Sequence, residues 1–290
     1  MKVAILGGTG GMGRWFASYF RGKAFDVILS GRFPEKTATV ARELGVGYAA
    51  SDDVAVRDAD MVVVSTPIEV TATIIRAVAS HMRKGAILYD LASVKGDVIE
   101  ALTQAAALGL RALSVHPLFG PGAPSMQGQR VLLIPVAAGH QVVNELAQLF
   151  QGDGGITHVL ASGDVHDKMM ALTLGLPHFL NILFARVLAG VDIRDVKTFA
   201  GTTFTLQLLL AESVLSQDPH LYYAIQSQNP AFTDLLTAIR MSLDELVSAV
   251  MRKDNPRFIT LFQDAATALA QDPGFSTAYQ RFYKALNASH

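Results

Sequence analysis

The sequence predicts an α/β protein in two parts: a doubly wound parallel sheet over residues 1–160 and an all-α domain over residues 161–290. Three observations predict this division. Up to about residue 160, continuous apolar runs alternate with segments of helical spacing, as in parallel strands that are covered on both faces. A glycine-rich turn follows the first apolar run. Beyond residue 160, no strand-like runs remain, and Asx-Pro pairs separate apolar segments of helical period.

The elements of the first part are predicted from these runs in chain order. Strands are predicted at residues 2–6, 26–30, 60–66, 86–91, 111–116 and 130–136. Helical spacing lies between them at residues 34–44, 70–81 and 95–107. Because the strand runs are continuous rather than alternating, we expect all six to be parallel and buried.

Four Asx-Pro pairs organise the second part: Asp218-Pro219, Asn229-Pro230, Asn255-Pro256 and Asp272-Pro273. An Asp or Asn side chain suits the N-cap, and proline suits the next position, so each pair predicts the start of a helix. After Pro230, apolar residues recur at the spacing of a helix face: Phe232, Leu235, Leu236, Ile239, Leu243, Leu246, Val247 and Val250. The extent of these apolar faces predicts a homodimer that forms through the helical domain.

Composition limits the function. The chain has 290 residues, a formal net charge of -1 and no basic run, so a nucleic acid partner is not expected. It has no cysteine, which excludes disulfides and thiolate metal ligands, and no metal site is predicted. The most apolar stretch, 172–191, contains Pro177, Asn181 and Arg186, so it is predicted to be a buried helix rather than a membrane span. The N-terminal apolar run ends at Gly7, too early for a signal peptide, and we expect a cytoplasmic protein without a membrane partner.

The glycine-rich turn carries the first functional signal. Gly8, Gly10 and Gly13 form G-x-G-x-x-G between the first strand and the first helix, the Rossmann-type fingerprint. In that fold, the backbone of the turn approaches a pyrophosphate, and the helix N-terminus supplies N–H donors. The predicted cofactor contacts here are Gly8, Thr9, Gly10, Gly11, Met12 and Gly13. The alternative is that the glycines serve only tight packing.

The end of the second strand indicates which dinucleotide binds. NAD-binding folds usually place Asp or Glu there for the ribose 2′-hydroxyl. This strand ends in Ser30, Gly31 and Arg32, a small residue and a cation that suit a 2′-phosphate. NADP is therefore favoured, with NAD as the alternative, unless Arg32 is only a solvated loop residue. Thr66 and Pro67, after the third predicted strand, are expected to border the cofactor.

Three further segments carry polar side chains toward one rim of the sheet: DLASVK at 90–95, SVHPLFGPG at 114–122 and HDKMMALTLGLPHF at 166–179. In an open parallel sheet, ligands bind beyond the carboxyl ends of the strands. Ser93 and His116 are both expected at that rim, where the third segment would cover them.

With these segments the chain resembles the prephenate and arogenate dehydrogenases of tyrosine biosynthesis. The resemblance runs from GGTGGMGRWFA through STP, DLASVK and HPLFGPG to HDKMMA and LPHF, nearly the whole chain, and is strongest to the compact archaeal-type members. It implies an oxidative decarboxylation of prephenate to 4-hydroxyphenylpyruvate. A hydride passes to the nicotinamide from the ring carbon that bears the hydroxyl, and the ring then loses carbon dioxide and becomes aromatic.

The resemblance also implies residue roles. His116, in HPLFGP, matches the catalytic histidine that pairs with the substrate hydroxyl. Ser93 matches a serine that contacts both this hydroxyl and the nicotinamide, and His178, in LPH, matches a residue of the substrate pocket. Each has a structural alternative: His116 as a hydrogen-bonded strand end, Ser93 as a helix cap, and His178 as a partner for backbone freed by Pro177. Lys95 is either bonded locally or solvated.

His166 and Asp167 are interpreted as structural, because His166 and His178 lie twelve residues apart, about 120° around a straight helix.

One departure concerns the substrate carboxylate. Bacterial members of the family carry an arginine in the later helical domain, but the matching stretch here, TLQLLLAESVLSQDP at 205–219, has none. The remaining candidates are Arg130, Lys168, Arg186 and Arg194, and prephenate and arogenate stay open as substrates. The alternatives to this family are another NADP-linked reductase of the same plan, such as an imine or deazaflavin-linked enzyme, a non-catalytic nucleotide sensor, and a scaffold protein.

Overall fold

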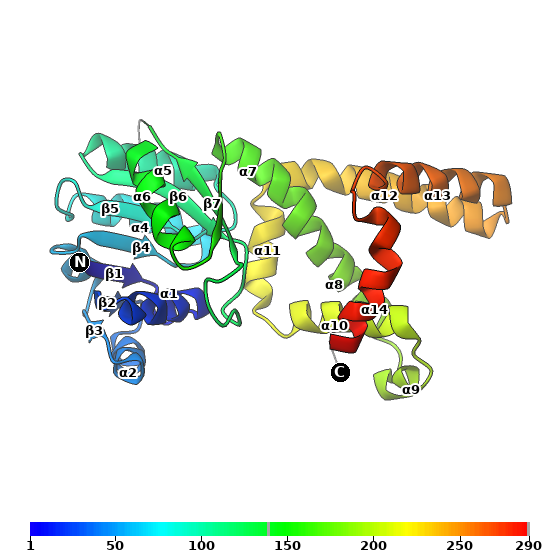
Figure 1. Ribbon diagram of the computed structural model, residues 1–290, viewed down its shortest axis with the longest axis horizontal. Coiled ribbons are helices and arrows are strands. Elements are labelled where there is room, and N and C mark those ends of the chain that lie inside the picture. The colour runs from blue at the N-terminus through cyan, green and yellow to red at the C-terminus, as the bar shows by residue number, and fades with distance from the viewer. Residues whose placement is uncertain (138–139, 289–290) are drawn as a thin grey trace. The chain divides into compact units, whose positions relative to one another are not determined.

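The computed structural model describes residues 1–137 and 140–288. The chain forms two compact units (Figure 1). The first combines Met1–Met170 with Tyr223–Asn229, and the second combines Ala171–Tyr222 with the chain from Pro230 onward. The sequence suggested a single boundary near residue 160, whereas the contacts group residues 161–170 and a short later segment with the sheet.

The first unit is built on one eight-stranded sheet, mostly parallel, in the order β3-β2-β1-β4-β5-β6-β7-β8. The strands are β1 (Lys2–Leu6), β2 (Asp26–Ser30), β3 (Gly47–Tyr48), β4 (Met61–Val64), β5 (Ile87–Asp90), β6 (Arg111–Pro117), β7 (Arg130–Pro135) and β8 (Ile156–Val159). Strand order reverses between β1 and β4, which is the topological switch point where open α/β sheets bind ligands. The predicted doubly wound sheet is confirmed.

One pairing differs from the prediction: β7 runs antiparallel to β6, with His116 opposite Leu132. Parallel neighbours are usually joined through a crossover helix, and residues 118–129 form none, so the chain returns directly beside β6. Two strands were also missed. β3 has only two residues, and both are exposed; β8 is mostly exposed, so neither shows a continuous apolar run.

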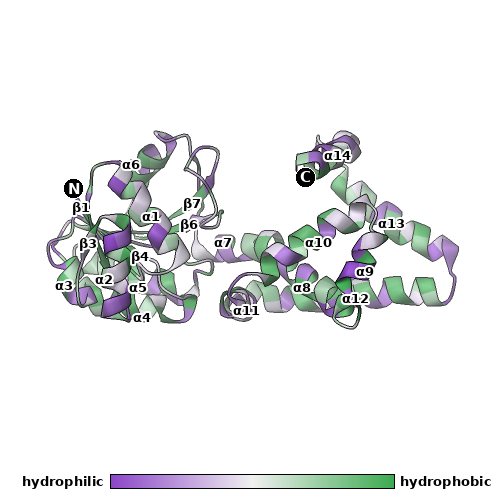
Figure 2. Ribbon diagram, turned by 90° about the horizontal axis from the view of Figure 1, so that it is seen from below, coloured by the Kyte–Doolittle hydropathy of each residue, from purple (hydrophilic) through white to green (hydrophobic). Residues whose placement is uncertain are grey.

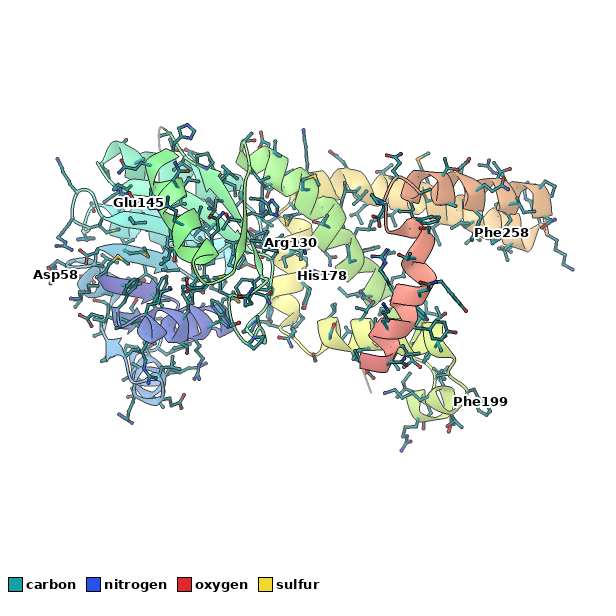
Figure 3. The ribbon with its side chains drawn as sticks, in the orientation of Figure 1. Asp58, Arg130, Glu145, His178, Phe199 and Phe258 are labelled. Carbon is teal, nitrogen blue, oxygen red and sulfur yellow. The ribbon has the colours of Figure 1, made fainter. Side chains whose placement is uncertain are left out.

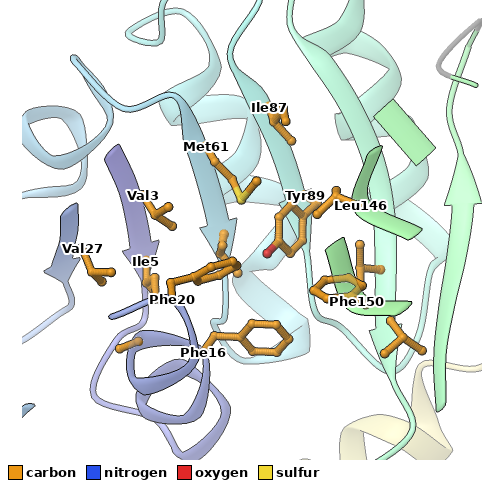
Figure 4. Close-up of a cluster of buried hydrophobic side chains, with 14 of the residues drawn as sticks. Val3, Ile5, Phe16, Phe20, Val27, Met61, Ile87, Tyr89, Leu146 and Phe150 are labelled. Carbon is orange, nitrogen blue, oxygen red and sulfur yellow. The ribbon is translucent and has the colours of Figure 1, made fainter. Parts of the chain in front are cut away.

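The helices of the first unit are α1 (Gly11–Gly22), α2 (Pro34–Leu44), α3 (Asp52–Val56), α4 (Ile68–Ala79), α5 (Gly96–Ala107), α6 (His140–Gln151) and α7 (Gly163–Met170). Phe16 and Phe20 of α1 and Phe150 of α6 pack on one face of the sheet, against Val3, Ile5 and Tyr89 among others (Figure 4). This cluster holds the N-terminus of α1 against the carboxyl ends of the central strands.

The second unit is helical. It contains a π-helical turn η1 (Ala171–Gly175), α8 (Leu176–Leu188), α9 (Ile193–Thr198), α10 (Thr202–Leu215), α12 (Pro230–Met251), α13 (Asn255–Leu269), a 3-10 turn η2 (Phe275–Thr277) and α14 (Ala278–Ala288). Helix α11 (Pro219–Ser227) runs from this unit into the segment that belongs to the first.

The Asx-Pro predictions have mixed outcomes. Pro219 and Pro230 begin helices as predicted. Helix α13 is capped by Asp254, one residue earlier than predicted, through a hydrogen bond from the Arg257 N–H. The prediction at Asp272-Pro273 is wrong. The Asp272 carboxylate accepts the Gly274 N–H and closes a turn there, so α14 begins only at Ala278.

Residues 172–191 were predicted to be buried, and this is also wrong for the single chain. Leu183 and Val187 are 38% and 75% exposed, because α10 packs against α8 and leaves a second face uncovered. Figure 2 shows apolar residues in green along α8, α12 and α13. In the part of the chain that the structure describes, one helix, Gly163–Leu188, is long and apolar enough to cross a membrane by length and composition, and 17% of its most apolar window is buried.

Candidate active site

The glycine-rich turn is shaped by its own packing. Gly7 has a φ of +76°, in the left-handed region that glycine tolerates. A Cβ on Gly13 would lie 2.6 Å from the Gly7 carbonyl oxygen, and one on Gly8 would lie 2.9 Å from Leu29. Gly8 and Gly13 are therefore required by the close packing of strand, turn and helix, and this packing leaves their backbone available for a cofactor contact.

The N-terminus of α1 fits an anionic cofactor group. Gly10 is the N-cap, no side chain caps the helix, and its first turn has no acidic residue. Gly10 and Gly11 are exposed, while Thr9 and Met12 are half-buried beside them. The first N–H groups of a helix have no partner within the helix, and they carry its positive dipole end. These residues therefore fit the pyrophosphate of a dinucleotide, for which the fold supplies the binding edge.

A carboxylate lies at the end of β2, where the sequence showed none. The Ser30 hydroxyl is buried and donates a hydrogen bond to Asp52 Oδ1 at 2.5 Å. Asp52 comes from the first turn of α3, 22 residues later in the chain, so the SGR motif alone could not reveal it. Arg32 is exposed, with its guanidinium 5.7 Å from the centre of the Phe33 ring. Asp52 and Arg32 thus place opposite charges near the end of β2.

Thr66 and Pro67 follow β4, next to the glycine turn. A Cβ on Gly7 would clash with the Ser65 carbonyl and touch Thr66, so this loop packs directly on the turn. Thr66 Oγ1 lies 2.9 Å from Thr71 Oγ1, and Pro67 is the N-cap of α4. The loop therefore has a fixed geometry at the switch point.

Lys95 and Asp90 form a buried ion pair near the carboxyl ends of β5 and β6. Lys95 is fully buried; its Nζ donates to Asp90 Oδ2 at 2.8 Å and to the Val115 carbonyl at 2.9 Å. Asp90 Oδ1 accepts the Ser114 hydroxyl at 2.6 Å. Burial lowers the pKa of Lys95, and the charge of Asp90 opposes this shift. The alternative of a solvated Lys95 is wrong, and the pair ties the carboxyl end of β5 to that of β6.

Asp167 joins the third segment to this rim. Its carboxylate accepts the backbone N–H of Lys95 at 3.0 Å and that of Gly96 at 3.3 Å, at the N-terminus of α5. The interpretation of Ser93 as the cap of this helix is wrong, because Lys95 is the N-cap and Asp167 supplies the acceptor. Ser93 is half-buried, two residues before the N-cap. Its segment is therefore held at both ends, by Asp90 and by Asp167.

His116 lies at the centre of the arrangement. It is 4% exposed, and its Nδ1 lies 2.8 Å from Nε2 of His166. The other ring nitrogen of His166, Nδ1, lies 2.7 Å from Asp167 Oδ1. Burial lowers the pKa of His116 well below its usual 6.5, and the positive charge of Lys95 lowers it further. The ring is therefore neutral at pH 7, as a proton acceptor must be.

The sequence interpretation missed His166. The comparison of His166 with His178 around a straight helix tested the wrong pair, since the partner of His166 is His116, which lies on a strand. The adjacent His-Asp pair was the available signal, because an aspartate beside a histidine often sets the direction of its ring protons.

His178 belongs to the second unit, on α8. Its Nδ1 is buried without a hydrogen-bond partner among the described residues, and its ring meets Tyr222 edge-on at 4.7 Å. Burial lowers its pKa. The Pro177 carbonyl accepts from Asn181 Nδ2 at 2.8 Å, so His178 is not the partner of backbone freed by the proline. Buried ring nitrogens usually have a hydrogen-bond partner, so this Nδ1 is a position where a ligand or a water molecule would be accommodated.

Comparison with protein families decides the relationship. The nucleotide-binding domain of prephenate dehydrogenase matches residues 16–159, and the dimerization domain of prephenate dehydrogenase matches residues 162–264. The chain belongs to the prephenate dehydrogenase family. A probable arogenate/prephenate dehydrogenase of Methanocaldococcus jannaschii is 32% identical over 92% of this chain, which spans 60% of that relative. This similarity to an archaeal protein agrees with the predicted resemblance to archaeal-type members.

Two further relatives cover most of both chains. A 4-amino-4-deoxyprephenate dehydrogenase of Streptomyces pristinaespiralis is 28% identical over 93% of this chain and 92% of its own. Prephenate dehydrogenase of Aquifex aeolicus, solved with hydroxyphenyl propionate and NAD+, superposes with a TM-score of 0.74 at 18% identity, over 93% of this chain and 98% of its own. The latter similarity shows a shared fold.

In this member of the prephenate dehydrogenase family, the four candidate partners of the substrate carboxylate, Arg130, Lys168, Arg186 and Arg194, are all exposed, and they differ in their positions in the fold. Arg194 is paired with Asp192, Lys168 is exposed on α7, and Arg186 is exposed on the second unit. Arg130, labelled in Figure 3, begins β7. Its backbone carbonyl accepts the Leu118 N–H. Since His116 is opposite Leu132, Arg130 and His116 lie on the same face of the sheet.

No cluster of three or more metal-ligating side chains occurs in residues 1–137 or 140–288.

Proposed function

We propose that this protein is a nicotinamide-dependent dehydrogenase that converts prephenate to 4-hydroxyphenylpyruvate and carbon dioxide in tyrosine biosynthesis. The observation that carries the proposal is His116, a buried and neutral histidine at the rim of a dinucleotide-binding sheet. Its motif HPLFGP and the family relationship connect that histidine to the substrate hydroxyl. Arogenate, which differs in the side chain of the substrate and not at the reacting ring, is the alternative substrate.

His116 acts first as a base. When bound, the nicotinamide supplies a hydride acceptor beside the ring carbon that bears the hydroxyl. His116 accepts the hydroxyl proton as the carbonyl forms at that carbon. Loss of carbon dioxide leaves a phenolate, and His116 returns the proton to its oxygen. The electron pair of the C–H bond leaves with the hydride, and the pair of the broken C–C bond enters the aromatic ring, so no further oxidant is needed.

Ser93 and His178 orient the substrate. Ser93 belongs to a segment anchored by Asp90 and Asp167, so its hydroxyl has a defined position for a hydrogen bond to the substrate hydroxyl and the nicotinamide. His178 offers a buried Nδ1 without a partner, which suits a polar group of the substrate. Arg130, on the His116 face of the sheet, is the proposed partner of a substrate carboxylate.

The dinucleotide binds along the glycine turn, at residues 8–13, with Ser30, Arg32, Thr66 and Pro67 at its borders. We propose NADP as the preferred form, because Arg32 is exposed at the end of β2 and offers a cation to a 2′-phosphate. Asp52 favours NAD by the same logic, since a carboxylate repels a phosphate and accepts from a ribose hydroxyl. NADP preference therefore requires the attraction of Arg32 to exceed the repulsion from Asp52.

The exposed apolar face of the second unit supports a homodimer. Val187, Leu243 and Val250 are exposed in the single chain, together with neighbours on α8, α12 and α13. The matched dimerization-domain family model covers these helices up to residue 264. A second copy would also cover exposed residues of the apolar helix Gly163–Leu188. His166 and Asp167, near the start of that helix, are already buried within the first unit. We therefore propose a dimer in the cytoplasm that needs neither a membrane nor a nucleic acid.

The deciding experiment is an assay of the purified chain with prephenate or arogenate, each paired with NADP⁺ or NAD⁺, that follows formation of the reduced nicotinamide. Turnover of prephenate with NADP⁺ above the other pairs supports the whole proposal. Turnover of arogenate alone changes the substrate and keeps the chemistry. If no pair turns over, while titration of Trp15 fluorescence still reports dinucleotide binding, the proposed reaction is wrong.

A further inference from the structure

We propose that His166 and Asp167 are positioning residues that fix the tautomer of His116, so that Nδ1 carries the proton and Nε2 presents a free lone pair to the substrate. This inference rests on the proposed role of His116 as the base. It adds two residues that the sequence interpretation treated as structural. It also names the ring nitrogen that performs the proton transfer.

The argument starts at Asp167. A carboxylate that accepts two backbone N–H groups at the N-terminus of α5 is held as an acceptor. His166 Nδ1, 2.7 Å from Asp167 Oδ1, must therefore be the donor in that hydrogen bond. A neutral imidazole has one N–H group, so Nε2 of His166 has a lone pair and no proton.

The tautomer of His166 then determines the tautomer of His116. Nε2 of His166, as an acceptor, lies 2.8 Å from Nδ1 of His116, which must then donate. His116 is also neutral, since burial and the positive charge of Lys95 oppose its protonation. Its single proton therefore resides on Nδ1, and its Nε2 is the free base. Without the Asp167 carboxylate, both rings could adopt the other tautomer. His116 would then present an N–H group to the hydroxyl whose proton it must accept.

The same carboxylate serves the other rim residue. The Lys95 N–H group that it accepts ends the segment that carries Ser93, so Asp167 restrains the positions of Ser93 and His116 together. The remaining buried charges near His116 are Lys95 and Asp90, which are paired with each other at 2.8 Å. Among the described residues, neither side chain hydrogen-bonds to the His116 ring, so the positions of the ring protons are set by Asp167 through His166.

The first test is ¹⁵N NMR of the full chain labelled at histidine, with bound dinucleotide and no substrate. Ring nitrogens with and without a proton differ widely in chemical shift, and the signals of His116 and His166 are assigned by their loss in His116→Gln and His166→Gln. We expect a protonated Nδ1 and a bare Nε2 in His116. A protonated Nε2 overturns the proposal. This measurement does not depend on any substrate, so it stands apart from the proposed reaction.

The second test uses matched variants. The amide of Asp167→Asn can donate its N–H to His166 and so favour the other tautomer of both histidines. We expect turnover to fall about 10²–10⁴-fold, with KM and dinucleotide affinity changed less than about threefold. His166→Gln retains one acceptor and one donor and should keep turnover within about tenfold. His166→Leu retains neither and should lose as much as Asp167→Asn. Asp164→Asn, exposed on the same helix, is the control.

The outcomes are distinct. Equal turnover in His166→Gln and His166→Leu, at any level, overturns the proposed role of the Asp167–His166–His116 hydrogen bonds, because packing alone would then explain the effect. A graded series with the glutamine variant above the leucine variant supports it. If Asp167→Asn does not fold, the two His166 variants and the NMR result decide. If the unaltered protein turns over neither substrate, the proposed function fails, and the NMR result alone decides the tautomer.

Discussion

His166 Nε2 lies 2.8 Å from His116 Nδ1, although the two histidines are fifty residues apart in the chain. This hydrogen bond joins the end of β6 to α7. It also brings three segments, DLASVK, SVHPLFGPG and the start of HDKMMA, to one point at the rim of the sheet. The site is therefore built from side chains of separate elements whose backbones the sheet and α5 hold in place.

The first prediction concerns His116. His116→Asn should lower turnover about 10²–10⁴-fold and leave dinucleotide affinity within about threefold, because the proposed role of the side chain is proton transfer and its hydrogen-bond partner among the described residues is His166. Steady-state assay and fluorescence titration measure the two effects. His158→Asn, an exposed histidine of β8, is the control. Wild-type turnover in His116→Asn would remove this residue from the mechanism.

The second prediction concerns the two charges near the end of β2. Arg32→Ser should weaken NADP binding more than NAD binding, whereas Asp52→Asn should strengthen NADP binding relative to NAD, because each change alters the charge that meets a 2′-phosphate. A factor of about 10 in the ratio of the two dissociation constants corresponds to 1.4 kcal/mol. Calorimetric titration of both dinucleotides is the measurement. Equal effects on NAD and NADP would show that neither side chain contacts the 2′ position.

The third prediction concerns the substrate carboxylate. Arg130→Gln should raise KM for prephenate about 10- to 100-fold without a matching change in dinucleotide affinity, because a charge-assisted hydrogen bond contributes about 1.5–3 kcal/mol. Arg194→Gln serves as the control, since Arg194 is paired locally with Asp192. If the two variants have the same KM as the unaltered protein, another cation binds the carboxylate.

The fourth prediction concerns the buried ion pair. Lys95→Met leaves Asp90 as an uncompensated buried charge and should lower the free energy of unfolding by about 3–5 kcal/mol. The double variant Asp90→Asn with Lys95→Met removes both charges and should be more stable than the single one. Denaturant unfolding of both variants measures this. A double variant no more stable than Lys95→Met would mean that the pair contributes by shape and not by charge.

The fifth prediction concerns pH. The pKa values of His116 and His166 are lowered in the folded protein, mainly by burial, from 6.5. Below pH 6.5 the unfolded chain therefore binds protons that the folded chain does not, so the free energy of unfolding should fall as the pH drops from 6.5 toward 5. Each histidine contributes up to about 1.4 kcal/mol per pH unit. Urea unfolding across this range measures the slope, which should be shallower in His166→Gln.

Much of the fold follows from local sequence. The strands β1 and β2 and the helix α2 have the predicted bounds, because each is a continuous apolar run or a helical pattern that ends at a glycine or an exposed turn. The direction of β7 was not predictable in this way, since an apolar run looks the same in either orientation. Only the lack of a helix in residues 118–129 indicated the reversal.

The candidate site was predictable one residue at a time, but not as a network. Motifs pointed to Ser93, His116 and His178, whereas Asp52 and His166 act through partners that are 22 and 50 residues distant. Contacts of that kind arise from tertiary packing, and a local sequence motif does not indicate the distant partner. Lys95 is the clearest case, because a lysine is rarely buried unless a partner is supplied by the fold.

Because Lys95 is buried, chemical labelling of its amine would report local opening of the protein around it. Its ammonium group has no exposed surface, so an acylating reagent reaches it only when this part of the protein opens. Exposed amines such as Lys168 would be modified at the rate of a free side chain. The ratio of the two labelling rates, read by mass spectrometry, would measure how often the rim between β5 and β6 opens, and how far a bound dinucleotide suppresses that opening.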